Sequence, residues 1–208
     1  MARQSGSLRA ELMTRRSETL SSPADLLTRV TTERERDGES PEGASETART
    51  GVLVAGTDAG RHDAFSVRRS VFVDEQGVDE AIEYDEHDEP GADAVHFVAY
   101  DDGDPIGAAR FRPVDGLDHG TDDAESDRTV KVERVAVAAD HRGSGWGRRL
   151  MRAVEARARE AGFERAALHA QTHVREFYER LGYEGHGAEF EEAGIPHVAM
   201  DKEFDGDV

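Results

Sequence analysis

The sequence of 208 residues contains no cysteine and only two lysines, Lys131 and Lys202. Without a thiol, the chain cannot form disulfides, use a cysteine nucleophile or hold a metal through thiolates. No apolar run is long enough to span a bilayer, and no apolar signal-peptide core follows Met1. These absences predict a soluble cytoplasmic protein, and we expect no metal.

Positive charge is scarce in most of the chain. Residues 51–208 hold 36 of the 45 Asp and Glu but only 18 of the 26 Lys and Arg, and the net charge of the whole chain is −19. Such a surface repels nucleic-acid phosphates and anionic lipids, so we expect neither nucleic acid nor membrane as a partner. An acid excess combined with few lysines is typical of halophilic proteins. The alternative is an ordinary acidic protein.

Large apolar residues are sparse at the N-terminal end. Residues 1–50 consist mainly of Arg, Glu, Ser, Thr, Gly and Ala. Such a segment buries too little apolar surface to offset the entropy of ordering it, so we expect a disordered polar tail. Residues 51–208 are long enough to form one folded domain with its own core.

The hydrophobic patterns predict a mixed α/β domain, with hairpins early and βαβ units late. The expected strands are residues 52–55, 94–100, 105–112, 130–137, 166–170 and 198–204, with another from Tyr183 onward. The expected helices are residues 64–73, 146–161 and 174–181. Residues 74–92 are expected to be irregular and acidic, and residues 114–128 to form a polar loop.

The strand at 130–137 changes phase. Val130 and Val132 share one parity, whereas Val135 and Val137 share the other. Because side chains alternate with a period of two in a regular strand, this change predicts a bulge or kink at residues 133–134.

A glycine-rich loop, RGSGWG at residues 142–147, lies between this strand and the next expected helix. Glycines let backbone N–H groups approach a ligand closely, and the helix N-terminus favours negative charge, so the loop favours a phosphate or pyrophosphate. A P-loop would need Lys and Ser or Thr after the last glycine, and the dinucleotide fingerprint would need different spacing. A tight turn without a ligand is the structural alternative.

Three segments in this order resemble the GCN5-related N-acetyltransferase (GNAT) superfamily: VERVAV at 132–137, RGSGWG at 142–147 and FYERLGY at 177–183. The loop pattern of that family, Gln/Arg-x-x-Gly-x-Gly/Ala, is matched by Arg142, Gly145 and Gly147. The segments VFVDEQ at 71–76, HFVA at 96–99, GAAR at 107–110 and GIPH at 194–197 resemble the ElaA and YjcF subgroup. Together they cover about residues 60–204.

The resemblance implies a GNAT (acyl-CoA N-acyltransferase) fold, with a mixed central β-sheet whose fourth strand is bulged and splayed, flanked by helices. It also implies acetyl-CoA as co-substrate. The pantetheine arm would pair with the strand backbone at Val135, Ala136 and Val137. The pyrophosphate would lie against the amides of Arg142, Gly143, Ser144, Gly145, Trp146 and Gly147, with Arg148 nearby.

The resemblance further places Tyr178 near the thioester sulfur, as a catalytic acid, although core packing alone would also explain it. Glu133 is a candidate base or a solvated strand residue. Candidates for the acceptor site are Gln171, His173 and His197, each of which could equally be an ordinary polar loop residue. Arg110 and Arg112 are expected to be surface charges. His169 and His173 bracket a strand end rather than sharing a helix face, which argues against a zinc site.

The function expected is transfer of an acetyl group from acetyl-CoA to a primary amine, which attacks the carbonyl directly in a ternary complex. The alternatives are a non-catalytic acyl-CoA sensor and a partner-binding module with a vestigial loop. The acceptor, small molecule or peptide, the acyl preference, the general base and the role of residues 1–50 are not determined by the sequence. The oligomeric state is also open, with a homodimer as one option.

Overall fold

In a computed structural model, the chain is described at residues 49–114 and 128–204. The expected tail at 1–50 and the polar loop at 114–128 therefore fall almost wholly outside the described residues. The described strands are β1 (Gly51–Val54), β2 (Val95–Asp101), β3 (Asp104–Pro113), β4 (Thr129–Val137), β5 (Arg165–Gln171), β6 (Glu184–Glu192) and β7 (Ile195–Glu203). The described α-helices are α2 (Asp58–Arg68), α3 (Glu80–Glu83), α4 (Trp146–Glu160) and α5 (Arg175–Glu179).

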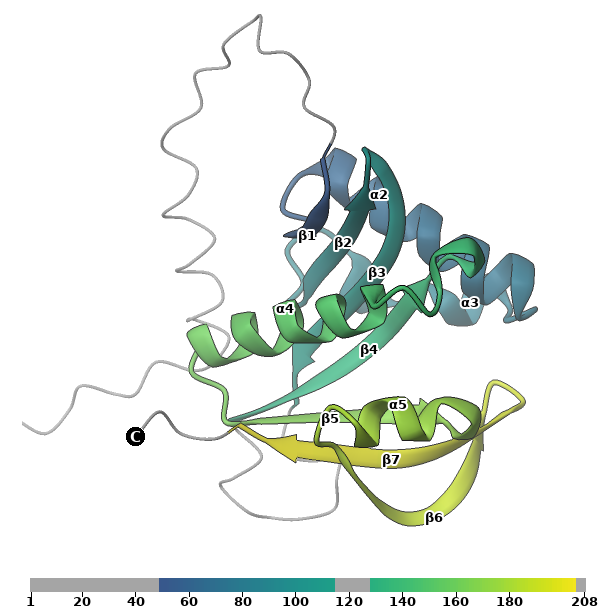
Figure 1. The fold of residues 1–208 in the computed structure, drawn as a ribbon, viewed down its shortest axis with the longest axis vertical. Helices are drawn as coiled ribbons and strands as arrows, with labels where there is room; N and C mark the ends of the chain where they lie inside the picture. Colours follow the sequence, from purple (N-terminus) through teal and green to yellow (C-terminus); the bar gives the residue numbers. More distant parts are fainter. Residues whose placement is uncertain (1–48, 115–127, 205–208) are drawn as a thin grey trace, which may run out of the picture.

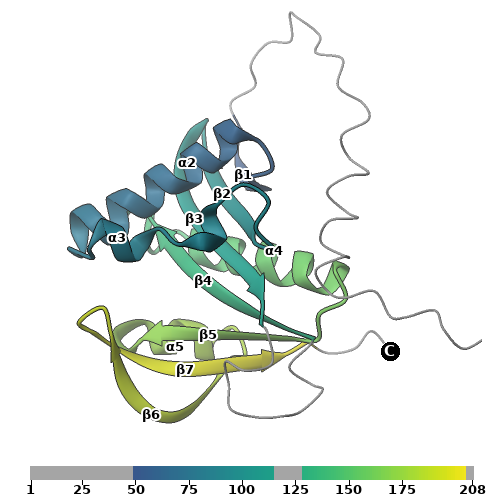
Figure 2. The same ribbon diagram turned by 180° about the vertical axis from the view of Figure 1, so that it is seen from behind.

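The seven strands form one sheet in the order β1-β2-β3-β4-β5-β7-β6. Neighbouring strands are antiparallel except β4 and β5, which pair in parallel. Figure 1 shows α4 and α5 on one face of the sheet, and Figure 2 shows α2 and α3 on the other. The structure confirms the mixed α/β fold expected from the sequence.

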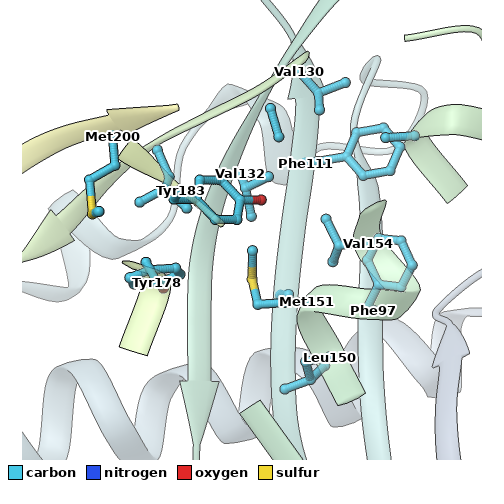
Figure 3. Close-up of a cluster of buried hydrophobic side chains, with 14 of the residues drawn as sticks. Phe97, Phe111, Val130, Val132, Leu150, Met151, Val154, Tyr178, Tyr183 and Met200 are labelled. Carbon is cyan, nitrogen blue, oxygen red and sulfur yellow. The ribbon is translucent and has the colours of Figure 1, made fainter. Parts of the chain in front are cut away.

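The apolar core has two parts, one on each face of the sheet. The larger lies under α4 and α5 and contains Phe97, Phe111, Leu150 and Val154, all nearly inaccessible to solvent (Figure 3). The smaller lies under α2, where Val67 packs with residues of β2, β3 and β4. Because both faces are covered near the centre of the sheet, β2 and β3 are apolar along most of their length rather than alternating.

The predicted bulge in β4 is confirmed. Along β3 and β4, Ala108 faces Ala136 but Arg110 faces Glu133, so two β4 residues stand opposite one β3 residue. Arg134 occupies the left-handed region with φ of 54°. The bulge has the consequence that valines of both parities, from Val130 to Val137, pack against the larger core.

The segment expected to be irregular, residues 74–92, contains more order than predicted. The π-helix that continues α2 over Arg69–Glu75 ends inside this segment, α3 forms a single turn over Glu80–Glu83, and a 3₁₀ turn covers Glu86–Asp88. Short polar side chains cap these turns: Asp79 accepts a hydrogen bond from the backbone of Ala81, and Asp85 and Asp88 form a reciprocal capping box. Local caps therefore order a stretch that lacks hydrophobic periodicity.

Candidate functional site

The site lies where β4 and β5 separate. Their parallel pairing ends at Val132 and Leu168, after which β4 stays with β3 and β5 stays with β7 (Figures 1 and 2). The backbone of β4 beyond Val132 thus has no strand partner on its β5 side within the described residues. Such an edge can accept an extended ligand as an added strand.

A cavity of about 1060 Å³ occupies the separation. Its walls come from the π-helix, α3, the bulged half of β4, the glycine loop, the first turns of α4, β5, α5 and the turn between β6 and β7. The volume is at the upper end of ligand pockets, so it suits a large cofactor together with a second substrate.

The glycine loop forms one end of this cavity. Gly143 and Gly145 have φ of 77° and 92°, a conformation that favours glycine, and a Cβ at either would meet nothing within 4 Å. Gly147 is needed for close packing, because a Cβ there would lie 3.2 Å from the ring of Phe177. Gly145 is the N-cap of α4 and provides no side-chain cap. The first N–H groups of α4 therefore remain available to an anion.

The cationic side chains around the loop have different roles. Arg142 donates to the carbonyl of Val137 at 2.9 Å and makes two hydrogen bonds to Glu75, at 2.7 and 2.6 Å. It therefore fastens the loop to β4 and to the π-helix. By contrast, Arg148 and Arg152 line the cavity and have no ion-pair partner among the residues that the structure describes. Their guanidinium groups therefore remain available to bind an anion, although the protein as a whole is acidic.

The side chains of Trp146 and Ser144 are engaged within the protein, so only their backbone amides are left for the cofactor role expected of them. The Trp146 side chain is buried in the larger core, with the guanidinium of Arg149 above its ring at 4.5 Å. Only the backbone of Trp146 can face a ligand, as the amide-based expectation requires. The Ser144 hydroxyl donates to the carbonyl of His141, within the same loop.

Tyr178 belongs both to the core and to the cavity wall. Its ring meets those of Phe177 and Tyr183 edge-on, at 4.9 and 5.8 Å. Burial raises the pKa of the Tyr178 phenol well above its usual range, because the phenolate would lose hydration. The side chain therefore enters any reaction as the neutral, proton-bearing phenol.

Glu133 lines the cavity, but three cations surround it. Its carboxylate lies 2.7 Å from Arg110, 3.5 Å from Arg112 and 3.4 Å from Lys131. Burial alone would raise the pKa of Glu133, but these cations, Arg110 above all, hold it below its ordinary value. A carboxylate so strongly neutralised is a weak proton acceptor.

The expectation that Arg110 and Arg112 are surface charges is wrong. Arg110 is 1% exposed and binds Asp85, Asp88 and Glu133 at 2.6, 2.9 and 2.7 Å. The side chain of Arg112 is only 14% exposed. The burial of Arg110 could have been predicted from the sequence, because it stands between Ala109 and Phe111 in an apolar strand. A charge at such a position needs buried partners.

The buried charges extend from Arg110 to the bulge. Arg68, on α2, binds Glu83 at 2.6 Å and Asp88 at 2.7 Å. Arg134 pairs with the same Glu83 at 3.0 Å and also donates to its carbonyl. The ion network thus holds α3, which lines the cavity through Ile82 and Glu83, against the bulge in β4.

The three acceptor-site candidates all line the cavity. Gln171 lies opposite His197 in the β5–β7 register and donates to the side chain of Gln76 at 2.9 Å. His197 is 9% exposed, with Nδ1 2.8 Å from the carbonyl of Ile195, whereas His173 is exposed. The cavity also contains Gln76, His169 and Glu192, which the sequence analysis did not assign to the site.

The described residues form neither a metal cluster nor a bilayer-spanning helix. In the described part of the chain, no group of three or more His, Asp or Glu side chains is arranged to hold a metal ion. Across residues 49–114 and 128–204, no helix combines the length and apolar character needed to cross a bilayer.

Comparison with known proteins agrees with this geometry. The model of the acetyltransferase (GNAT) domain family matches residues 57–204. The chain is 37% identical over 153 residues to the uncharacterized N-acetyltransferase YjcF of Bacillus subtilis, covering 73% of this chain and 99% of YjcF.

Two crystal structures share the fold. An acyl-CoA N-acyltransferase from Pseudomonas aeruginosa has a TM-score of 0.57 and 27% identity, covering 73% of this chain and 97% of that one. ElaA of Escherichia coli has a TM-score of 0.60 and 24% identity, covering 74% of this chain and 99% of ElaA. The chain belongs to the GNAT family and is an acyl-CoA-dependent N-acyltransferase.

Proposed function

We propose that the protein transfers an acetyl group from acetyl-CoA to a primary amine, with both substrates bound at once. The observation that carries this proposal is the cavity itself, which runs from the glycine loop to the polar end of β5 and contains Tyr178. One cavity that joins an anion site, a free strand edge and a proton donor suits direct transfer without a covalent enzyme intermediate.

In this proposal the cofactor binds along β4 and the loop. The free edge at Val135, Ala136 and Val137 pairs with the amides of the pantetheine arm. The amides of residues 142–147 and the N-terminus of α4 hold the pyrophosphate, and Arg148 adds positive charge. The net charge of −19 makes this local positive site important, because the rest of the surface repels the cofactor.

The acceptor binds at the opposite end, where Gln171, His173 and His197 provide polar contacts. Its neutral amine attacks the thioester carbonyl, forming a C–N bond as the C–S bond breaks. The phenol of Tyr178 gives a proton to the departing thiolate, whose parent thiol has a pKa of about 8.5. Glu133 remains ion-paired with Arg110 and with Lys131, next to the reacting groups.

Turnover is tested by thiol release from acetyl-CoA with a panel of small amines, amino sugars and peptides, in molar KCl. The chain has no cysteine, so released CoA provides the only thiol in the assay. We expect Tyr178→Phe to lower kcat about 10²-fold with CoA affinity unchanged. Tyr183→Phe is the matched control, because Tyr183 is also buried but does not line the cavity.

Three results would separate this proposal from its alternatives. CoA binding without turnover of any amine would favour a sensor. The absence of CoA binding would favour a partner-binding module. Unchanged turnover in Tyr178→Phe would remove the phenol from the mechanism and leave it a packing role.

A further inference from the structure

The acceptor end of the cavity contains a histidine–carboxylate pair that the mechanism above does not use. Nδ1 of His169, on β5, lies 2.9 Å from a carboxylate oxygen of Glu192, at the end of β6. Both residues line the cavity. Their side chains are 28% and 48% exposed, so they are within reach of a bound substrate.

The pair fixes the tautomer of the imidazole. The hydrogen bond from His169 is the main reason why the pKa of Glu192 is lowered, to about 2. Glu192 is therefore ionised and can only accept, so Nδ1 of His169 must carry a hydrogen. The neutral ring then presents a lone pair on Nε2, which has no hydrogen-bond partner among residues 49–114 and 128–204.

The ring is also held in place by packing. Phe190 meets the His169 ring edge-on at 4.8 Å, and the His197 ring stacks on Phe190 at 6.1 Å. The contact with Phe190 and the hydrogen bond to Glu192 together restrain the ring, so it loses little entropy when a substrate arrives.

The position of His169 complements that of Tyr178. Leu168 and Ala170 belong to the larger core, together with Tyr178, so the alternation of β5 directs His169 to the opposite face of the sheet. Gln171 and His197 lie on that same face. The imidazole and the phenol thus approach the separation of β4 and β5 from opposite faces, as separate sites for proton removal and proton donation require.

We infer that His169 is the general base that removes the proton from the acceptor amine, and that Glu192 is its positioning residue; this rests on the proposed acetyl transfer. As the C–N bond forms, Nε2 of His169 takes a proton from nitrogen, and Glu192 stabilises the resulting imidazolium. The C–S bond breaks and the thiolate takes the Tyr178 proton. Solvent then returns one proton from His169 to Tyr178, so acids and bases are restored.

Glu133 is less suited to this role. Protonating Glu133 would weaken its ion pairs with three cations at once, whereas Nε2 of His169 has no hydrogen bond to a described residue that protonation would disturb. The charged groups that face the pair are Lys131 on β4 and His197 on β7, and both help to lower the pKa of Glu192 on β6.

The test compares kcat against pH for His169→Gln, Glu192→Gln and a matched control, His186→Gln. His186 forms a similar pair with Asp201, at 3.1 Å on the same hairpin, but does not line the cavity. We expect His169→Gln to lower kcat about 10²-fold and to abolish the acid limb of the profile. Glu192→Gln should lower kcat about tenfold and move the acid limb of the profile to lower pH, because the imidazolium of His169 loses its carboxylate partner.

Calorimetry with CoA shows whether each variant keeps its fold and cofactor site. For a His169→Gly variant that binds CoA normally, added imidazole should restore part of the activity. If His169→Gln and Glu192→Gln keep normal kcat and an unchanged acid limb, the base assignment is overturned. If the wild type turns over no amine, the proposed function itself fails, and the base role fails with it; the two failures are therefore distinguishable.

Discussion

His96 is buried beside the ion network without a full set of partners, and this predicts a specific acid sensitivity. It is 5% exposed, its Nδ1 has no hydrogen-bond partner in the described part of the chain, and its Nε2 lies 3.4 Å from the carbonyl of His87. Burial lowers the pKa of His96 to about 4. The charges of Arg68 and Arg110 lower it further, whereas the carboxylate of Asp88 raises it in part.

The direction of the pH dependence follows from the different proton affinities of His96 in the folded and unfolded states. The folded-state pKa of about 4 lies below the unfolded value of 6.5, so in this interval the unfolded chain binds the extra proton. The contribution of His96 to stability is complete above pH 6.5 and is lost as the pH falls towards 4. A shift of this size corresponds to about 3 kcal/mol of unfolding free energy. Most of it should be lost between pH 7.5 and 4.5.

The assay is urea unfolding at several pH values and constant KCl, for the wild type, His96→Leu and His62→Gln. His62 is exposed on α2 and serves as the control. The wild type and His62→Gln should lose about 2.5 kcal/mol between pH 7.5 and 4.5, and His96→Leu should lose far less. The carboxylates with lowered pKa values, such as Asp88, act mainly below this interval. Equal pH slopes for the wild type and His96→Leu would refute the argument.

Three other predictions follow from the site and the surface. Gly145→Val should lower CoA affinity at least tenfold in calorimetry, because a β-branched residue is strained at φ of 92°; Gly56→Ala, where a Cβ meets nothing, is the control, and equal affinity would contradict the loop assignment. Arg134→Gly should raise the acceptor KM several-fold without changing CoA affinity, since glycine keeps the φ of 54° but releases α3; an unchanged KM would show that holding α3 against the bulge does not position the acceptor. The melting temperature should rise with KCl, because screening relieves repulsion within a chain of net charge −19; a flat curve would count against salt adaptation.

The parts of the fold that the sequence predicted are those with a local signal. The phase change around Glu133 located the bulge, and glycines bounded α4 at Gly145 and Gly162. The π-helix had no such signal, because only its hydrogen bonds differ from those of an α-helix: Gln76 donates to Val71, five residues earlier.

The parts that the sequence did not predict depend on contacts between distant segments. Arg110 has the parity of an exposed residue until α2 and α3 cover that face of the sheet. His169 and Glu192 are 23 residues apart and meet only because β7 lies between their strands. Neither relation can be read from periodicity or from spacing along the chain.

The π-helix also bears on how acceptor preference could change. Phe72 and Glu75 line the cavity from this wide turn and Gln76 lines it from the C-cap, while Val71 both lines the cavity and packs in the smaller core. Deleting one residue within Arg69–Glu75 would convert the wide turn to an α-turn, because a π-turn holds one residue more, and would change which of its side chains face the cavity while the flanking residues keep their orientation. Such a deletion would therefore remodel this part of the cavity wall and leave the sheet unaltered.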